Sequence, residues 1–505
     1  MNRGITMDVI TTQGDTLMLR ILIQKELRAI LGSPKFAATF AVCSLLMLLS
    51  VFIGIREYRT AASQYGEALE LTAQNLRTQP SWMGLTTTTY RAPDPMQVFI
   101  PGVNNDVGRL SGINGFEDVK LKNSTYADDP IFALFRSIDF SFIVQVVLSL
   151  FAILFTYDAI NGEREGGTLQ LTFSNPVPRS TYILAKLAGS WLSLAVPLLV
   201  PVLLGVLLVM LYGIPFAAGD WARLGLFLLV SFLFFSFFIA LGVFISTLTQ
   251  RPATSFLVSL AAWVTLVLII PRLGVMAAGV ADPVPSVAET EAGVDAFSKD
   301  RWDAQMKEME ARWQTRQETM KGMTKEQREA YQQEKEKEWS ADDEAGRMSV
   351  QKDIDAYAVR VNEDLRNRKT HQERFAFALA RVSPASSYQL ASMNLAGTGV
   401  SLKSRYEDAM REYRTAFTRY VDRKQKETGG QGGFRITVDS QTGFHFSAPR
   451  ERGTLDVSDL PAFLPPVTRF SETASGALID AGLLAGFSLA AFAGAFLAFR
   501  RYDVR

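Results

Sequence analysis

Long apolar runs alternate with polar segments along this chain, at 36–55, 132–157, 182–212, 224–248, 253–270 and 474–499. Each run is about 20 residues or longer with few or no charges, as a helix needs to cross a bilayer. A cleaved signal peptide is the alternative for 36–55. That run is too long for one, and no small-x-small cleavage site precedes Arg56. The pattern therefore predicts six transmembrane helices, the second to fifth of them within 132–271.

The polar segments predict the remaining elements. In the N-terminal segment 1–35, residues 17–31 have the spacing of an amphipathic helix that lies along the membrane surface. Alternation around Met96–Ile100 and Val119–Leu121 suggests short strands within 56–131. The fold class we expect is an all-α six-helix membrane bundle with an α+β extracytoplasmic domain that contains a long helical hairpin.

The hairpin is expected in the largest polar segment, 272–473. Gly322 interrupts its first helix, and Thr324 with Gln327 forms a capping box that starts a helix through Lys337, with a further helical run toward Ala380. Apolar residues at spacings of four, three and seven suggest a coiled-coil seam, with a cargo-binding groove as the alternative: Trp302, Met306, Met309, Trp313, Met320 and Met323. A helix at 404–426, a flexible G-G-Q-G-G joint at 429–433 and a β-hairpin complete the segment.

Basic residues indicate the orientation, since cytoplasmic loops carry an excess of them. They gather at one face of the six predicted helices: Arg20, Lys25, Arg28, Lys35, Arg164, Arg179, Lys186, Arg251, Arg500 and Arg501. We therefore expect both termini, the loop 158–182 and the tail 500–505 to be cytoplasmic and the protein to lie in the cell inner membrane. The segments 56–131 and 272–473 are then extracytoplasmic.

Composition narrows the chemistry. The 52 basic and 51 acidic residues nearly cancel, so no nucleic-acid partner is expected. Cys43 is the only cysteine, which excludes an intramolecular disulfide. No Gly-Lys dipeptide occurs, hence no phosphate-binding loop, and the hydrolase motifs H-E-x-x-H and G-x-S-x-G are missing. We expect no catalytic residue, no metal and no bound cofactor; a site made by His371 and His445 is the metal alternative.

Two features lie within the predicted helices. Asp139, Asp158 and Asp480 lie near helix ends, where an interfacial carboxylate in contact with water or a lipid headgroup is the simplest interpretation. Small residues recur at intervals of four along the last helix, which predicts close helix packing within or between subunits. This stripe consists of Gly482, Gly486, Ala490 and Gly494.

The polar stretch between the second and third apolar runs holds E-R-E-G-G-T-L at 163–169 and P-V-P-R at 176–179, followed by Lys186. A capped connecting loop without further role is one interpretation. Both charge signs, however, suit a surface that docks a soluble partner. With the K-E-L at 25–27, the stretch resembles the type-two ABC transporter permeases. The resemblance implies an elbow helix with Lys25, Glu26 and Leu27, and a coupling helix with Glu163, Arg164, Glu165, Gly167, Thr168, Leu169 and Arg179.

For function, the resemblance implies an exporter permease. Two copies of a separate cytoplasmic ATPase would hold ATP and Mg, and a second permease chain, identical or homologous, would complete the path through the lipid. Usual members have short outer loops, whereas this chain resembles a subgroup with large extracytoplasmic insertions, so no substrate is implied. The alternative is a mechanotransmission complex, or a scaffold, whose outer domain acts on a periplasmic or surface protein without solute transport.

Overall fold

The computed structural model describes residues 3–79, 82, 85–115, 119–124, 138–427, 435–439, 443–447 and 455–502. These residues divide into two compact units, Met1–Ile269 with Ser383–Arg505, and Ile270–Val382. Six helical segments of the described residues are long and apolar enough to cross a membrane, which agrees with the prediction of an integral membrane protein. The predicted start of the second span, 132–137, the joint at 429–433 and the tail residues 503–505 lie outside the described residues.

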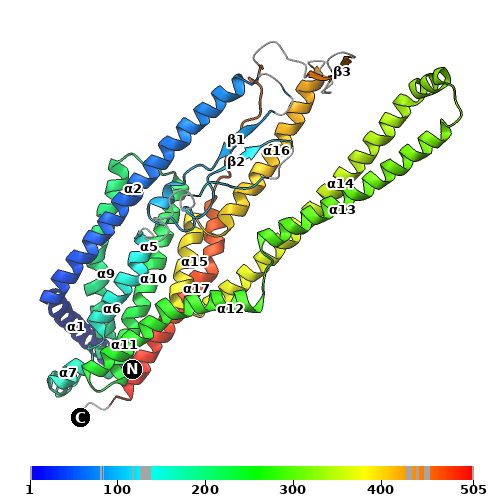
Figure 1. The fold of residues 1–505 in the computed structure, drawn as a ribbon. Helices are drawn as coiled ribbons and strands as arrows, with labels where there is room; N and C mark the ends of the chain where they lie inside the picture. Colours follow the sequence, from blue (N-terminus) through cyan, green and yellow to red (C-terminus); the bar gives the residue numbers. More distant parts are fainter. Residues whose placement is uncertain are drawn as a thin grey trace. The chain divides into compact units, whose positions relative to one another are not determined.

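The spanning helices of the first unit lie side by side (Figure 1). The helix α1 (Arg3–Leu31) precedes them. The spanning helices are α2 (Pro34–Arg77), α5 (Phe140–Phe142) continued by the π-helix η2 (Ile143–Leu148) and α6 (Ser149–Thr156), α9 (Arg179–Leu211), α10 (Ala218–Leu248), α11 (Pro252–Trp263) continued by the π-helix η3 (Val264–Ile269), and α17 (Phe470–Arg500). The helix α9 contains Pro197 and Pro201.

The first two helices are longer than their apolar patterns suggest. The elbow helix starts at Arg3 instead of residue 17, and α2 continues past Ile55 to Arg77. The stretch 56–77 lacks proline and is rich in Ala, Glu, Leu, Gln and Arg, which favour helix in water as well as in lipid. The change to polar residues therefore marks where a helix leaves the apolar layer, and the helix itself continues.

The strands of the first polar segment lie elsewhere than predicted. A 3₁₀ turn, η1 (Pro95–Val98), replaces the strand expected at Met96–Ile100, because Pro95 starts the turn and Asp94 caps it by accepting from the Met96 N–H at 2.9 Å. The antiparallel strands are β1 (Thr87–Tyr90) and β2 (Leu110–Ile113). The strand expected at Val119–Leu121 is reduced to one bridge between Leu110 and Lys122.

The helix α16 (Ser401–Glu427) packs beside β2. Its bounds are close to the predicted range of 404–426. Its apolar face forms a separate core with Trp82, whose ring meets the Tyr420 ring edge-on at 5.8 Å. The strands β3 (Arg435–Asp439) and β4 (Gly443–Ser447) pair antiparallel, which confirms the predicted β-hairpin.

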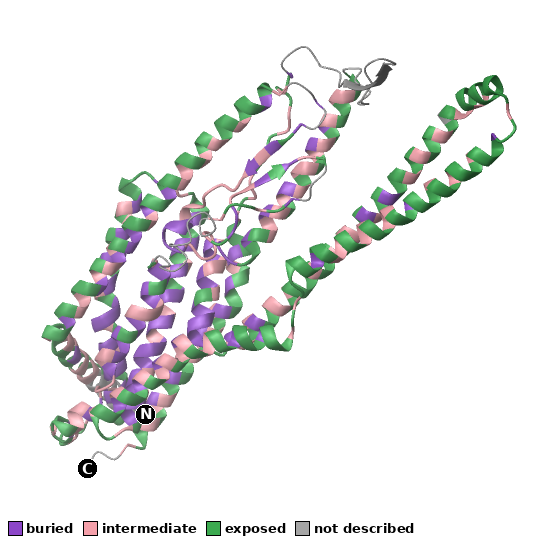
Figure 2. Ribbon diagram, viewed as in Figure 1, coloured by how far each residue is buried: buried purple, intermediate pink, exposed green. Residues whose placement is uncertain are grey.

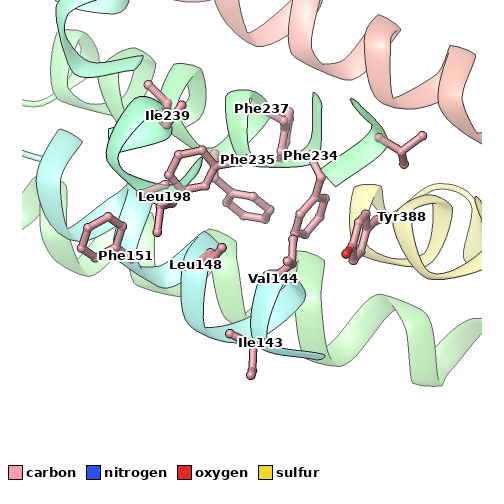
Figure 3. Packing of buried hydrophobic residues seen from close by; sticks show 14 of the residues in the cluster. Ile143, Val144, Leu148, Phe151, Leu198, Phe234, Phe235, Phe237, Ile239 and Tyr388 are labelled. Carbon is pink, nitrogen blue, oxygen red and sulfur yellow. The ribbon is translucent and has the colours of Figure 1, made fainter. Parts of the chain in front are cut away.

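The helix α15 (Pro384–Ala396) departs most from the sequence pattern. It belongs to the long polar segment between the fifth and sixth apolar runs, yet it is buried against α10 and α17. Tyr388 is fully buried, stacks on Phe234 of α10 at 4.7 Å between ring centroids, and lies 3.2 Å from the Ser231 hydroxyl (Figure 3). Small side chains, Ala and Ser, let α15 fit between two larger helices.

The chain leaves and re-enters the first unit at neighbouring points. The fifth apolar run was expected to stop at Pro271, but helix continues from η3 into α12 (Ile270–Ala281). In a π turn the carbonyl of Leu266 would accept from the N–H of residue 271, but residue 271 is a proline and has no N–H. The Ser383 hydroxyl donates to that carbonyl instead, and Ser383 also caps the start of α15.

The second unit contains α12 and the antiparallel hairpin of α13 (Val287–Thr319) and α14 (Lys325–Ala380). The capping box of Thr324 and Gln327 is confirmed. One helix then runs to Ala380, where two were expected, because 338–353 contains no proline and a single glycine, Gly346, is tolerated inside a helix.

The predicted coiled-coil seam does not hold this hairpin together. Its contacts come from neighbouring positions, with Phe297 stacked on Tyr357 at 4.1 Å and Arg301 paired with Asp353. Met306 and Trp313 of the predicted seam are 56% and 58% exposed, and with Met309 they line an open pocket. The seam prediction was wrong for the first part of α13, whose facing stripe lies about one residue, or 100°, around the helix. At its end the prediction holds for Met320, which is buried and contacts Gln332 of α14 at 3.5 Å.

Candidate functional site

The predicted coupling stretch folds into two short helices, α7 (Asn161–Glu165) and α8 (Thr168–Phe173). Gly167 between them has a φ of 71°, a left-handed conformation that glycine adopts without strain. The start of α7 is anchored on α10, where the Ser246 hydroxyl accepts from the N–H groups of Ile160 at 3.0 Å and Asn161 at 3.3 Å. The stretch is therefore held at the Leu248 end of α10.

Glu163 of α7 is the centre of a charged cluster that joins three helices. One of its carboxylate oxygens accepts from Lys25 of α1 at 2.8 Å and from Lys186 of α9 at 2.9 Å. The other accepts from the Tyr182 hydroxyl at 2.6 Å. Lys186 also pairs with Glu26 of α1 at 2.6 Å. We call these five residues the Glu163 cluster.

The cluster is withdrawn from solvent except at Lys25, whose side chain is 44% exposed. The side chains of Lys186, Glu26 and Glu163 are 5%, 9% and 15% exposed. Buried charges of this kind are tolerated when each has an opposite partner and hydrogen bonds, and removing one partner leaves the others uncompensated. A Cβ on Gly189 would lie 2.6 Å from that of Glu26, so glycine there is what lets α1 approach α9 closely.

The rest of the stretch is tied to the end of α17. Arg179 donates to the carbonyl of Arg500 at 2.8 Å. Arg164 lies over the Tyr502 ring at 5.5 Å and reaches its hydroxyl at 3.4 Å. Tyr182 stacks on Phe499 at 5.1 Å. Displacing α7 would thus strain contacts to α1, α9 and α17 together.

The structure separates the predicted coupling residues into inward and outward groups. Glu163 faces inward, contrary to the expectation of a displayed charge, and Leu169 is fully buried. Glu165 and Thr168 face outward. The sequence analysis missed Leu171, which is 69% exposed on α8. The signal that could have indicated it is an apolar residue in a polar loop, with no other apolar residue three or four positions away to pack beside it.

The elbow residues divide similarly. Lys25 is partly exposed and Glu26 is buried, both within the cluster, while Leu27 is half-buried. The sequence analysis identified Glu26 only as part of the K-E-L motif at 25–27. Its partner Lys186 lies 160 positions further along the chain, and only the packing of α1 on α9 brings the two together.

The small-residue stripe of α17 is mostly unpacked within one chain. Only Gly494 meets a neighbour, the Phe244 ring, at 3.1 Å from an added Cβ. Gly482, Gly486 and Ala490 are exposed. Figure 2 shows how exposed and buried residues are distributed over the helices of the first unit. Within a single chain, the predicted close packing thus holds at one of the four positions.

The three candidate interfacial carboxylates differ. Asp139 caps α5 by accepting from the Phe142 N–H at 2.6 Å, and Asp158 is half-buried. Asp480 is fully buried, so its interpretation as a water-exposed carboxylate was wrong. Among described residues no three His, Cys, Asp or Glu side chains gather as a metal site would require. His371 pairs with Asp282, and the His445 side chain lies outside what is described.

Comparison with known proteins gives two matches. The family model for ABC-2 family transporter proteins matches residues 20–396, which contain α7, α8 and the whole Glu163 cluster. Over 125 residues the chain is 32% identical to the probable ABC transporter permease protein NosY of Stutzerimonas stutzeri. That match covers 24% of this chain and 45% of the relative, so the similarity spans less than half of the relative's length.

Proposed function

Because the chain belongs to the ABC-2 family of transporter proteins, we propose that it is the permease subunit of an ATP-driven exporter, and that a separate cytoplasmic ATPase docks on α7 and α8. The observation that carries this proposal is the Glu163 cluster. It connects a loop with an outward face to α1 and α9 through hydrogen-bonded, buried charges. A connecting loop without further role would need none of these contacts.

The docking surface consists of the outward side chains of the two short helices. An exposed leucine surrounded by small polar groups is the pattern of an anchor that fills a pocket on a partner, with a polar rim around it. The residues are Glu165, Thr168, Gln170, Leu171 and Ser174. Leu169 supports this surface from below, because it is buried in the bundle core.

Movement would pass from the docking surface into the membrane through the cluster. When the ATPases close, α7 is pushed against α1 and α9, and the shared carboxylate of Glu163 moves both helices as one body. The contacts of Arg164 and Arg179 with the end of α17 extend the same movement to the last span.

The complete assembly contains two permease chains, identical or homologous, and two ATPases that hold ATP and Mg. The exposed small residues of α17 favour a helix partner that one chain does not supply. We place both termini, α7 and α8 on the cytoplasmic side of the inner membrane because basic residues gather there.

A second candidate function is mechanical transmission without solute transport. The observation that favours it is the continuity of α2, which extends from Pro34 through the apolar layer to Arg77 and there contacts β1. The core of α16 also includes Leu76 at the end of α2. A tilt of α2 would therefore move this polar part directly and could act on a periplasmic or surface protein.

Leu171→Asp tests the docking surface. We expect it to abolish copurification of the ATPase and its stimulation by the permease, while the yield of inserted permease stays unchanged. Val359→Asp, which places the same charge at another exposed apolar position on α14, is the matched control. Retention of the ATPase by Leu171→Asp would contradict docking at this surface. ATP-dependent solute movement in vesicles then distinguishes the two candidate functions.

A further inference from the structure

A second polar site lies at the opposite end of α10 from the coupling stretch. Asp220 and Ser246 are 26 positions apart on this helix, or about 39 Å at 1.5 Å per residue. Near Asp220, the starts of α10 and α17, the end of α15 and the loop before η1 surround a pocket of about 510 Å³. All of these elements belong to the first unit.

Arginines dominate the charge of this pocket. Four line it, against two aspartates, Asp94 and Asp220. The arginines are Arg91, Arg223, Arg405 and Arg469. Burial lowers the pKa of Arg91 to about 10, with nearby Arg109 adding to the effect, so Arg91 stays charged at neutral pH. The pocket thus carries a positive excess in partly desolvated surroundings, where charge interactions are stronger than in water.

Two of these guanidinium groups have hydrogen-bonding capacity to spare. Arg223 is 3% exposed and contacts Asp220, Asp94 at 3.4 Å and the Ala396 carbonyl at 3.5 Å, yet its Nε has no acceptor. Arg405 donates to the Gly397 carbonyl at 3.0 Å, and its Nε likewise has no acceptor. A buried donor left without a partner is costly. Both Nε atoms are closed off from solvent, so a ligand with acceptor oxygens would reach them after a shift of these side chains.

Two long helices begin at this pocket, and a carboxylate in the first turn of each, Asp220 in α10 and Glu472 in α17, offsets part of the positive field of the helix. The starts of α10 and α17 both line the pocket, at Gly219 and Phe470. The first N–H groups of a helix have no acceptor within the helix, and its macrodipole is positive at that end. Arg469 is the N-cap residue of α17, and its side chain accepts no hydrogen bond from the first N–H groups of this helix. Phosphate groups commonly bind where helix N-termini and arginine forks meet.

We propose that this pocket binds a phosphate-bearing anion, with Arg223 and Arg405 as its principal donors and the starts of α10 and α17 as additional ones. The proposal concerns binding alone and does not rest on transport or on ATPase docking. Both a free phosphate and a lipid headgroup carry the required chemistry. Asp94 and Asp220 orient Arg223 and at the same time weaken binding by repulsion.

The test uses the purified full chain in dodecyl maltoside micelles, which carry no phosphate, titrated calorimetrically with inorganic phosphate at constant ionic strength in KCl. A second arm titrates soluble dihexanoyl phosphatidic acid. Saturation by phosphate identifies a small-anion site, and saturation by the lipid alone identifies a headgroup site. If neither probe binds more tightly than chloride, the proposal is wrong.

Variants distinguish a ligand site from a purely structural ion pair. Arg405→Gln should weaken binding about tenfold, as the loss of one charged hydrogen bond predicts. Arg223→Lys keeps the charge for Asp94 and Asp220 but removes the Nε donor, and should weaken binding similarly. Arg411→Gln, an exposed arginine outside the pocket, is the control and should bind as wild type.

Asp94→Asn provides the most specific readout. Asparagine can still accept from the Met96 N–H and so preserves the cap of η1. Removing the negative charge should strengthen binding about threefold or more, because repulsion of the anion falls. A merely structural ion pair would show no gain in affinity, and unchanged or weaker binding in this variant would overturn the proposal.

Discussion

The Glu163 cluster and the α13–α14 hairpin both join helices through ion pairs, but in opposite surroundings. In the cluster, Lys186 is 5% exposed and bridges two carboxylates. In the hairpin, the side chains of Arg301 and Asp353 are 37% and 46% exposed and pair one to one. The cluster is therefore a connected set of mostly buried charges, whereas the hairpin pair is independent and in contact with water.

This difference determines what each region can transmit. In the cluster, loss of Lys186 leaves two carboxylates in a desolvated space without their buried partner, so α1, α7 and α9 move together or the cluster breaks. In the hairpin, water replaces a lost partner at little cost, and packing such as Phe297 on Tyr357 holds the helices. The four predictions that follow test this contrast.

The largest effect is expected for Lys186→Met. The side chain keeps its length but loses the charge, which leaves Glu26 and Glu163 without their buried partner. We expect a loss of about 3–5 kcal/mol in stability, or roughly 3–5 °C in Tm for a chain of this length. Thermal unfolding of the purified chain measures it. Met at Lys35, an exposed lysine outside the cluster, is the control, and equal Tm values for the two variants would refute the contrast.

Glu163→Gln should have the next largest effect. Glutamine can still accept from Tyr182 but no longer balances Lys25 and Lys186. We expect about 2–3 kcal/mol of destabilisation, the range for charged hydrogen bonds, together with reduced ATPase stimulation in the assembled complex. Glu165→Gln removes the same charge from the neighbouring exposed position and should leave Tm unchanged. If the Glu163→Gln permease still stimulated the ATPase normally, the Glu163 cluster would have no role in coupling.

Much of this architecture could be predicted from the sequence because bilayer crossing depends on length and hydropathy. The spans and the place of the polar stretch 158–182 between two of them follow from that pattern. α15 was missed because its burial depends on small residues, whose hydropathy is unremarkable; Ser386, Ser387 and Ser392 are buried there. The hairpin seam was misplaced because periodicity alone does not state which of two adjacent stripes faces the partner helix.

The candidate site shows the same limit. A local motif indicated Glu163, Arg164 and Arg179 as a group, but the inward direction of Glu163 depends on Lys25 and Lys186, which lie on other helices. Such contacts between distant positions arise only from packing. The outward position of Leu171 follows equally from the way α8 rests on buried Leu169.

Tyr182→Phe should have a smaller effect, since it removes a neutral donor and leaves every charge paired. The ring keeps its stacking on Phe499, and only the 2.6 Å bond to Glu163 is lost. We expect about 1–2 kcal/mol, measured as the shift in Tm. Combining it with Glu163→Gln measures the coupling energy, and full additivity of the two effects would show that they do not act as one cluster.

The smallest effect is expected at the hairpin pair. Arg301→Gln and Asp353→Asn each leave a partner that water can reach, because both side chains are more than one third exposed. Each change should cost about 0–1 kcal/mol and the double mutant no more than their sum. The measurement is the same Tm series, with raised salt as a second condition that screens exposed pairs and hardly affects buried ones. A hairpin loss as large as that of Lys186→Met, insensitive to salt, would mean that this pair is also desolvated in the assembled protein, for instance by a partner that covers the exposed Met306 and Trp313.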